Sequence, residues 1–231
     1  MIRRICLAVI IVFISTLPSF TQVIATGAMR DVMWKGELYG KIKLDTITPK
    51  KGLYGLGPVE GLSGEILIAD GKIYASKVVA DSVMKVEENA SVSAPFFVHA
   101  YVHNWRMIEI PSNINNLKKL EEHLSEISKN QESPFVFRLE GEIQRANIHV
   151  VNLPPGSKVS SPDDAHRGQQ NFEIKNKRSS AIGFHSRHHK GIFTHHDSNI
   201  HLHLITNDRK MMGHVDELMF SPANVEVWLS Y

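Results

Sequence analysis

The sequence predicts a strand-rich domain of the α/β class, α+β type, with mixed and antiparallel β-sheets and one clear amphipathic helix. Short apolar segments recur along the chain and are separated by glycine-rich or polar turns. One segment, about 113–129, instead places its apolar residues at helical spacing. The apolar fraction is 42%, which is ordinary for a globular protein with a buried core.

The composition points away from nucleic acid and toward histidine chemistry. The chain has 231 residues with 26 Lys+Arg against 24 Asp+Glu, so its formal net charge is only +2. Such a balance gives no electrostatic footprint for a nucleic-acid partner. The 13 histidines are unusual, and seven of them lie between His185 and His203. The histidines are therefore not spread at random along the chain.

The first residues predict a signal peptide, 1–25. Arg3 and Arg4 precede the apolar stretch Ile5–Leu17, which is too short to span a membrane comfortably. Small residues before position 26 favour cleavage after Ala25, and an uncleaved anchor is the alternative. The only cysteine, Cys6, lies in this segment, so the mature chain would be exported, to the periplasm or outside the cell, without disulfides. No membrane association is expected after cleavage.

The proposed domain, 26–231, is expected to have two halves. In the first, a mixed-sheet half of about 30–150, segments 34–44 and 65–69 predict strands. Asp70-Gly71 predicts a tight hairpin turn, with Lys72–Tyr74 as the return strand.

The remaining elements follow in order along the chain. Ser93–Ile110 predicts one or two strands, and the helix comes next, capped by Ser112 or Asn113. Strands are then expected over 135–153, and Pro154–Gln170 has the composition of a loop. The second half, about 170–231, is expected to be a metal-binding β half with strands at 180–186, 191–196, 199–206 and 224–230.

Three histidines near the end of the chain could hold one cation. Residues i and i+2 of a strand project to the same face, so His201 and His203 lie side by side while their apolar neighbours face a core. His214 returns after a polar turn, next to Gly213, which would let the backbones approach closely. Three histidines with one position left open suit a catalytic zinc ion. The alternative is that they are surface or core histidines without a ligand role.

Several further histidines cluster just before this strand. Most are expected to be polar loop residues or adventitious metal binders, and some could line a pocket: His185, His188, His189, His195 and His196.

Two blocks of the sequence resemble the alpha-acetolactate decarboxylase family. "IHLHLITNDRKMMGHVDEL" is similar to its H-L-H-F-I strand and G-G-H-V turn, and "YGLGPVEGLSGEILIADGKIY" is similar to its block around a G-E pair. "SAPFFVHAYV" and "FVFRLEGEIQRANIHVV" resemble two further strands of the family. The matches extend from about Trp34 to Phe220.

The resemblance implies a zinc-dependent carbon–carbon lyase that converts 2-acetolactate to acetoin, as in acetoin and butanediol biosynthesis. It implies Zn²⁺ ligands at His201, His203 and His214, with Glu65 as a further ligand or proton-transfer group. Zinc would act as a Lewis acid on the substrate's carbonyl and hydroxyl oxygens. The resemblance also implies a small-molecule substrate, a 2-hydroxy-2-methyl-3-oxo acid, and a homodimer.

The sequence departs from the family at two functional positions. An arginine of the family's active site aligns with His149, which we expect to hold the substrate carboxylate when it is protonated. The alternative is that His149 is a strand residue with its ring outward, and carboxylate binding then falls to Arg145 or the His185–His189 loop. The sequence ends at Tyr231, and neither Glu217 nor Glu226 matches the C-terminal glutamate that the family returns to its metal. Two alternatives therefore stay open, a hydrolase-type zinc enzyme on the same fold and an exported zinc-binding protein without catalytic activity.

Overall fold

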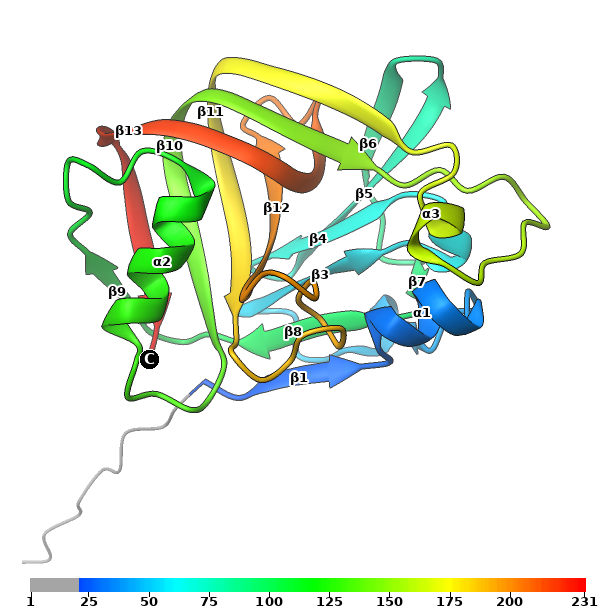
Figure 1. Cartoon of the computed structure of the whole chain (residues 1–231), viewed down its shortest axis with the longest axis horizontal. Helices are drawn as coiled ribbons and strands as arrows, with labels where there is room; N and C mark the ends of the chain where they lie inside the picture. Colours follow the sequence, from blue (N-terminus) through cyan, green and yellow to red (C-terminus); the bar gives the residue numbers. More distant parts are fainter. Residues whose placement is uncertain (1–20) are drawn as a thin grey trace, which may run out of the picture.

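The computed structural model describes residues 21–231, so the predicted signal peptide lies largely outside the described residues (Figure 1). One six-stranded sheet is formed mainly by the first hundred residues. Its strands, in spatial order, are β1 (Val23–Thr26), β8 (Phe97–Tyr101), β3 (Leu53–Pro58), β4 (Glu65–Ala69), β5 (Lys72–Ala80) and β6 (Val83–Glu88).

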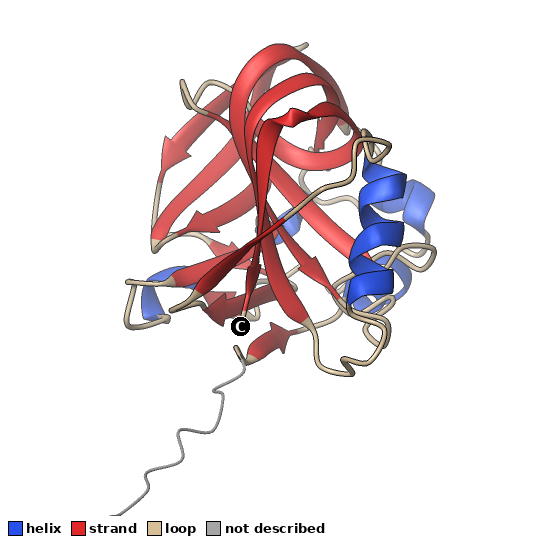
Figure 2. Cartoon of the chain, turned by 90° about the vertical axis from the view of Figure 1, so that its left-hand side faces the viewer, coloured by secondary structure: helices blue, strands red, loops and turns tan. Residues whose placement is uncertain are grey.

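The second sheet closes on itself. Its strands are β10 (Phe135–Val150), β11 (Gln170–His185), β12 (Ile200–Thr206), β13 (Met212–Ser230) and, at the edge, β9 (Trp105–Ile108). Because β10 also pairs with β13, strands β10 to β13 form a ring of four. The long bent strands of this ring are visible in Figure 2. A two-stranded pair, β2 (Ile42–Lys43) with β7 (Ser93–Ala94), completes the strands.

The helices are short and lie at the periphery. They are α1 (Met29–Lys35), α2 (Leu117–Ile127), α3 (Pro162–Ala165) and the 3-10 turns η1 (Leu44–Thr46) and η2 (Glu60–Leu62). Among the described residues, no helix is long and apolar enough to cross a membrane.

The strand-rich class with one clear amphipathic helix is confirmed, although details differ. Helix α2 begins later than 113, because Asn116 caps it by accepting a hydrogen bond from the Lys119 backbone N–H (3.0 Å). Leu120 and Leu124 are fully buried against the ring, as their spacing predicts, whereas Ile127 is exposed.

The structure differs from the expected two halves in the type of the first sheet and in the boundary between the halves. All pairings between the named strands are antiparallel, so the first half forms an antiparallel sheet rather than a mixed one. Strands β9 and β10 belong to the second sheet, so the two sheets divide after β8 and not near residue 150.

Two predicted strands are mostly not strands. Segment 34–44 contains only the short β2, because α1 extends into it. Residues 191–196 form a turn, in which the Gly191 N–H bonds to the Thr194 carbonyl (2.8 Å) and Phe193 stacks on His189.

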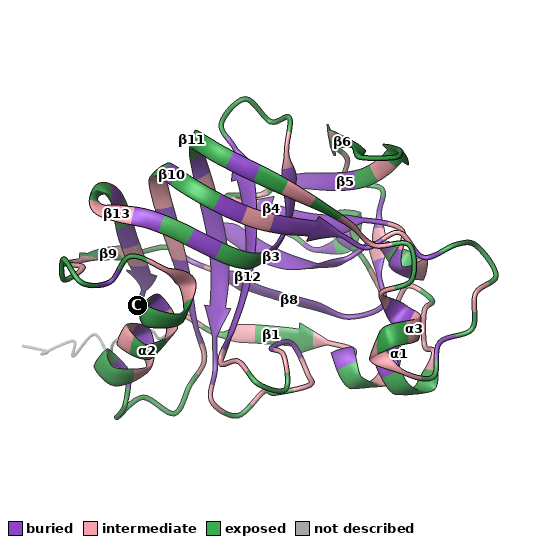
Figure 3. Ribbon diagram, turned by 45° about the horizontal axis from the view of Figure 1, so that its top comes forward, coloured by how far each residue is buried: buried purple, intermediate pink, exposed green. Residues whose placement is uncertain are grey.

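Buried residues alternate with exposed ones along the long strands β10, β11 and β13 (Figure 3). One core fills the ring beneath α2, and it includes Ile200, Leu202 and Leu204. A second core joins the six-stranded sheet to the outer face of the ring, and it includes Leu67, Ile205 and Met212. His201 and His203, on the same face of β12 as Ile205, therefore face the space between the two sheets.

The predicted cleavage position falls inside a strand. Val23 to Thr26 pair with Ala100 to Phe97 of β8. Cleavage after Ala25 remains a prediction, but it would remove three of the four residues of β1.

Candidate metal centre

The structure brings His201, His203 and His214 together at one point between the sheets. His201 and His203 alternate on β12 toward the six-stranded sheet, and His203 lies directly opposite His214 of β13. Their ring centroids are 4.9–5.5 Å apart. One ligand nitrogen from each ring lies within 4.8 Å of the others, and all three side chains are buried. The spatial grouping follows the sequence prediction.

Hydrogen bonds orient two of these rings and leave one nitrogen of each free. His203 Nδ1 donates to the Ile66 carbonyl at 2.9 Å, and its buried Nε2 has no hydrogen-bond partner within residues 21–231. His201 has a hydrogen bond with the Phe193 backbone, and its buried Nδ1 lacks a hydrogen-bond partner in the described part of the chain. Unpaired buried polar atoms are costly, and carbonyl-held imidazoles are typical metal ligands. The donor set therefore fits a divalent cation such as zinc.

Burial also keeps these rings neutral, as a metal ligand requires. Desolvation, followed by the nearby histidines, lowers the pKa of His203 to about 3. The same causes hold the pKa values of His201 and His214 well below the ordinary range. Each imidazole thus carries a lone pair at neutral pH and does not repel a cation.

Glu65 lies at this point as the first residue of β4. Its side chain is 3% exposed, Oε1 accepts a hydrogen bond from the Val151 N–H (3.2 Å), and Oε2 is 3.7 Å from His203 Nε2. Burial raises the pKa of Glu65 to about 8. Since the carboxyl is then protonated and His203 neutral near pH 7, the contact is not an ion pair. Glu65 is placed to supply a proton or, once deprotonated, a ligand oxygen.

His149 adjoins the site through His214 rather than through the other two rings. Its ring centroid is 4.6 Å from that of His214, and its Nδ1 is 2.8 and 2.9 Å from the two carboxylate oxygens of Asp216. Burial alone would lower the pKa of His149, but the hydrogen bond to Asp216 and the charge of that carboxylate, joined by Glu65 only when Glu65 is ionised, leave the pKa raised.

The other residues considered for the missing family groups lie elsewhere. Arg145 is half-exposed and paired with Glu173 (2.8 Å), so it does not substitute for the family arginine. Glu217 is exposed and bonds to Asn147 (2.7 Å), and Glu226 lies opposite Glu140 on the β10–β13 pair. None of them joins the three-histidine group.

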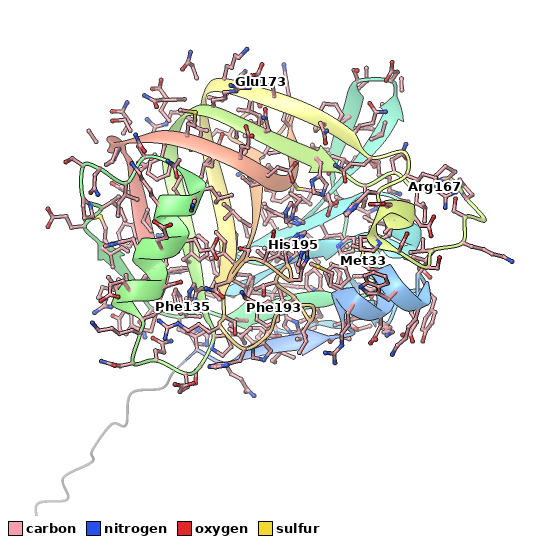
Figure 4. All side chains as sticks on the ribbon, viewed as in Figure 1. Met33, Phe135, Arg167, Glu173, Phe193 and His195 are labelled. Atoms are coloured by element: carbon pink, nitrogen blue, oxygen red, sulfur yellow. The ribbon has the colours of Figure 1, made fainter. Side chains whose placement is uncertain are left out.

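Sequence reasoning missed Asp216 and did not single out His195 or His166. Asp216 could have been found, because it follows His214 by two residues. The ring of His195 lies 4.9 Å from His214 and 6.0 Å from His201, near the middle of the molecule in Figure 4. His166 lies 6.2 Å from His149. His195 lies in a loop and His166 at the end of α3, so no helix or strand periodicity predicts where their side chains point.

A cleft opens beside the site where β12 and β13 separate. Their pairing ends at His203 and His214, and α2 covers part of the gap. We call this space, with a volume of about 670 Å³, the fork cleft. Its lining includes, next to the site, His195, His214 and Asp216 and, further away, Asn116, Leu117, Lys118, Glu121, Asp197, Ser198, Ile200, Leu202, Val215, Glu217, Leu218 and Met219. Of the three-histidine group only His214 lines this cleft, so the cleft gives solvent and small molecules a route to the His214 side of the site.

The fold and this site define a class of strand-rich proteins that use buried, neutral histidines and one buried carboxyl at the junction of two antiparallel sheets. Residues 26–230 match the family model described as "Alpha-acetolactate decarboxylase". The chain belongs to this family.

Individual relatives agree with this assignment. The chain is 27% identical over 195 residues to an alpha-acetolactate decarboxylase of Brevibacillus brevis, covering 83% of this chain and 65% of the relative. It is 26% identical over 169 residues to one of Methanosarcina mazei, covering 72% of this chain and 56% of the relative. The chain thus spans less than two thirds of the length of these two relatives.

Solved structures show the same fold. The alpha-acetolactate decarboxylase of Bacillus subtilis strain 168 superposes with a TM-score of 0.73 at 22% identity, covering 90% of this chain and 85% of that one. A Staphylococcus aureus protein of unknown function, described as similar to alpha-acetolactate decarboxylase, gives a TM-score of 0.71 at 16% identity, covering 90% and 84%.

Proposed function

We propose that this protein is a carboxy-lyase that converts 2-acetolactate to acetoin and carbon dioxide, with zinc held by His201, His203 and His214. The observation that carries the proposal is the meeting of three buried neutral imidazoles with the buried Glu65 in a domain of this family. A bound zinc ion would supply Lewis-acid stabilisation of the charge that develops on the substrate's oxygens.

Glu65 is the proposed proton donor. Loss of carbon dioxide leaves the electron pair of the broken C–C bond on the substrate as an enediolate, which must gain one proton at carbon to become acetoin. Burial raises the pKa of this carboxyl, whereas a bound zinc ion would lower it, so the two effects together bring the pKa toward neutrality. A carboxyl with such a pKa can deliver that proton, and its fixed position favours one face of the product. The Val151 N–H then stabilises the carboxylate that remains.

His149 is the proposed contact for the substrate carboxylate. It occupies the position that aligns with the family's arginine, and the raised pKa of its imidazole favours the cationic form. Asp216 shares that charge, so the attraction for an anion is weaker than that of a free guanidinium.

The remaining expectations concern the setting of the reaction. The fork cleft would admit a small 2-hydroxy-2-methyl-3-oxo acid, whereas a nucleic-acid partner is disfavoured by the balanced charge. Export after cleavage of the first residues and assembly as a homodimer are part of the same proposal.

One observation favours a second candidate. Among residues 21–231, no arginine lines the fork cleft, so strong carboxylate binding is not an evident feature of this site. A different zinc enzyme of the hydrolase type, using metal-activated water, would not need one.

The deciding experiment combines an assay and a metal analysis on one sample. Purified protein starting at Thr21, which keeps β1, is given racemic acetolactate, and acetoin and carbon dioxide are measured before and after chelator treatment. Equal yields of both products, lost with the metal and restored by zinc, support the decarboxylase. A zinc-loaded protein that forms no acetoin would favour the hydrolase candidate or a non-catalytic zinc-binding protein.

A further inference from the structure

His195 stands between the fork cleft and the three-histidine group, and the proposed reaction does not use it. Its ring centroid lies 4.9 Å from that of His214 and 6.0 Å from that of His201 (Figure 4). Within residues 21–231, the group around His203 whose ligand atoms lie within 4.8 Å of one another does not include His195. His195 is therefore a neighbour of the ligands that is open to the cleft, and not a further ligand.

The loop before β12 holds His195 in place from both sides. On one side, the Phe193 side chain is buried, and its backbone is hydrogen-bonded to His201. On the other side, the Asn199 backbone N–H donates a hydrogen bond to Glu121 of α2 at 2.6 Å. Because both flanks are anchored, His195 is preorganised, and a ligand that it binds does not have to order the loop.

His195 and Glu65 contact different members of the three-histidine group. Oε2 of Glu65 is 3.7 Å from His203 Nε2, and the Glu65 side chain is buried. His195 adjoins His214, and both of these rings line the fork cleft. A small acid that enters through the cleft therefore meets His195 on its way to the ligands.

From these contacts we infer that His195 positions the substrate by donating a hydrogen bond from its imidazole to a carboxylate oxygen. Of the cleft residues next to the site, the Asp216 carboxylate is an acceptor already bonded to His149, and His214 is assigned to the metal. His195 is thus the donor left for an anion there, and with His149 it offers the two N–H groups that one guanidinium would supply.

This donor role does not depend on titration, because an imidazole carries an N–H group in both its neutral and its cationic form. The choice of a 2-hydroxy acid as the ligand rests on the proposed function. The test therefore uses 2-hydroxy-2-methylpropanoate, a 2-hydroxy acid that has no ketone and cannot be decarboxylated to an enediolate. Binding is then measured without any turnover.

The full chain is loaded with Zn²⁺, its zinc content is measured, and the acid is titrated into it in a calorimeter. His195→Phe keeps an aromatic ring but has no N–H group, and we expect its Kd for the acid to rise by about 10–100-fold with unchanged zinc content, as for the loss of one hydrogen bond to a charged group. His195→Gln restores an N–H group and should recover much of the lost affinity.

The matched control is His196→Phe, which makes the same change at the adjacent exposed position and should alter neither Kd nor zinc content. Thermal unfolding of each variant shows that it is folded. The inference is overturned by equal Kd values for His195→Phe and the unmodified protein, by a His195→Gln affinity no better than that of His195→Phe, or by an unmodified zinc-loaded protein that does not bind the acid.

Loss of zinc from folded His195→Phe also overturns the inference, because His195 would then support the metal site and not the substrate. The proposed decarboxylation fails separately. An unmodified protein that forms no acetoin but binds the acid with the expected pattern among the variants would refute the decarboxylation and leave the role of His195 in binding intact.

Discussion

His203 and Glu65 face each other with 3.7 Å between Nε2 and Oε2, and the same imidazole is bonded through Nδ1 to the carbonyl of Ile66. Two consecutive residues of β4 therefore fix one ring of β12. The backbone carbonyl sets the tautomer, and the side chain faces the nitrogen left free to bind a cation. This contact joins the two sheets at the candidate metal centre.

Removing the free nitrogen of His203 should remove the metal. In His203→Ala, the group retains two imidazoles, and we expect at least a tenfold fall in zinc affinity and loss of acetoin formation. Zinc content and acetoin release are measured on the same sample. His103→Ala, at an exposed position, is the matched control and should keep both. Normal zinc affinity in His203→Ala would refute the ligand assignment.

Glu65→Gln should separate binding from chemistry. The amide oxygen can still accept the Val151 hydrogen bond, so the fold should be retained. The amide cannot donate a proton as a carboxylic acid does, and kcat for acetoin formation should fall by about 10²–10⁴. Zinc bound per chain should stay near the unmodified value if Glu65 acts as the acid. A variant with unchanged kcat would show that the proton comes from elsewhere.

The sequence predicts those site residues whose direction follows from the alternation of side chains along a strand. Alternation along 200–206 is enough to place His201 and His203 on one face, with Ile200, Leu202 and Leu204 in the ring core. The carboxylate of Asp216 is different, because its direction depends on a bulge that arises from the register between β10 and β13.

The same limit explains the errors around 191–196 and 34–44. Both segments contain apolar and β-branched residues in short runs, but in each one tertiary contacts decide the conformation. The Phe193 side chain is fully buried by a turn and not by strand pairing, with its ring stacked on His189. Propensity alone does not distinguish these outcomes.

Gly213 allows β13 to pass close to β10, whereas the sequence suggests a close approach to the strand of His201 and His203. A Cβ added there would lie 2.4 Å from the His149 carbonyl oxygen. Gly213→Ala should therefore push the strands apart, destabilise the protein by about 1–3 kcal/mol and weaken zinc binding through the adjacent His214. Chemical denaturation and zinc titration measure the two effects. Unchanged stability would mean that the backbone relaxes around the methyl group.

Asp208 should stabilise the β12–β13 turn in a pH-dependent way. Its carboxylate accepts hydrogen bonds from the Thr206 hydroxyl (2.6 Å), the Lys210 N–H (3.2 Å) and Lys177 Nζ (3.2 Å). These bonds, the Thr206 one first, lower the pKa of Asp208 to about 2. A lowered pKa gives stability that is present above the ordinary value of 3.8 and is lost as the pH falls toward 2.

The test compares Asp208→Asn with the unmodified protein across that range. The variant should have the lower Tm at pH 6, and the difference should shrink between pH 4 and pH 2. Thr206→Val removes the first hydrogen bond donor and should reduce the same difference. A Tm difference that stays constant with pH would argue that the carboxylate charge does not matter to the turn.

The last prediction concerns where the folded chain must begin. A protein starting at Thr26 keeps only the Thr26–Phe97 pair of β1 and leaves Val98, His99 and Ala100 of β8 at an open sheet edge. Each backbone hydrogen bond contributes about 0.5–1.5 kcal/mol net, so a protein starting at Thr21 should unfold at a Tm several degrees higher. Calorimetry on the two proteins measures this difference, and N-terminal sequencing of exported protein identifies the natural start. Equal Tm values would show that β1 is dispensable and that cleavage after Ala25 does not reduce the thermal stability of the protein.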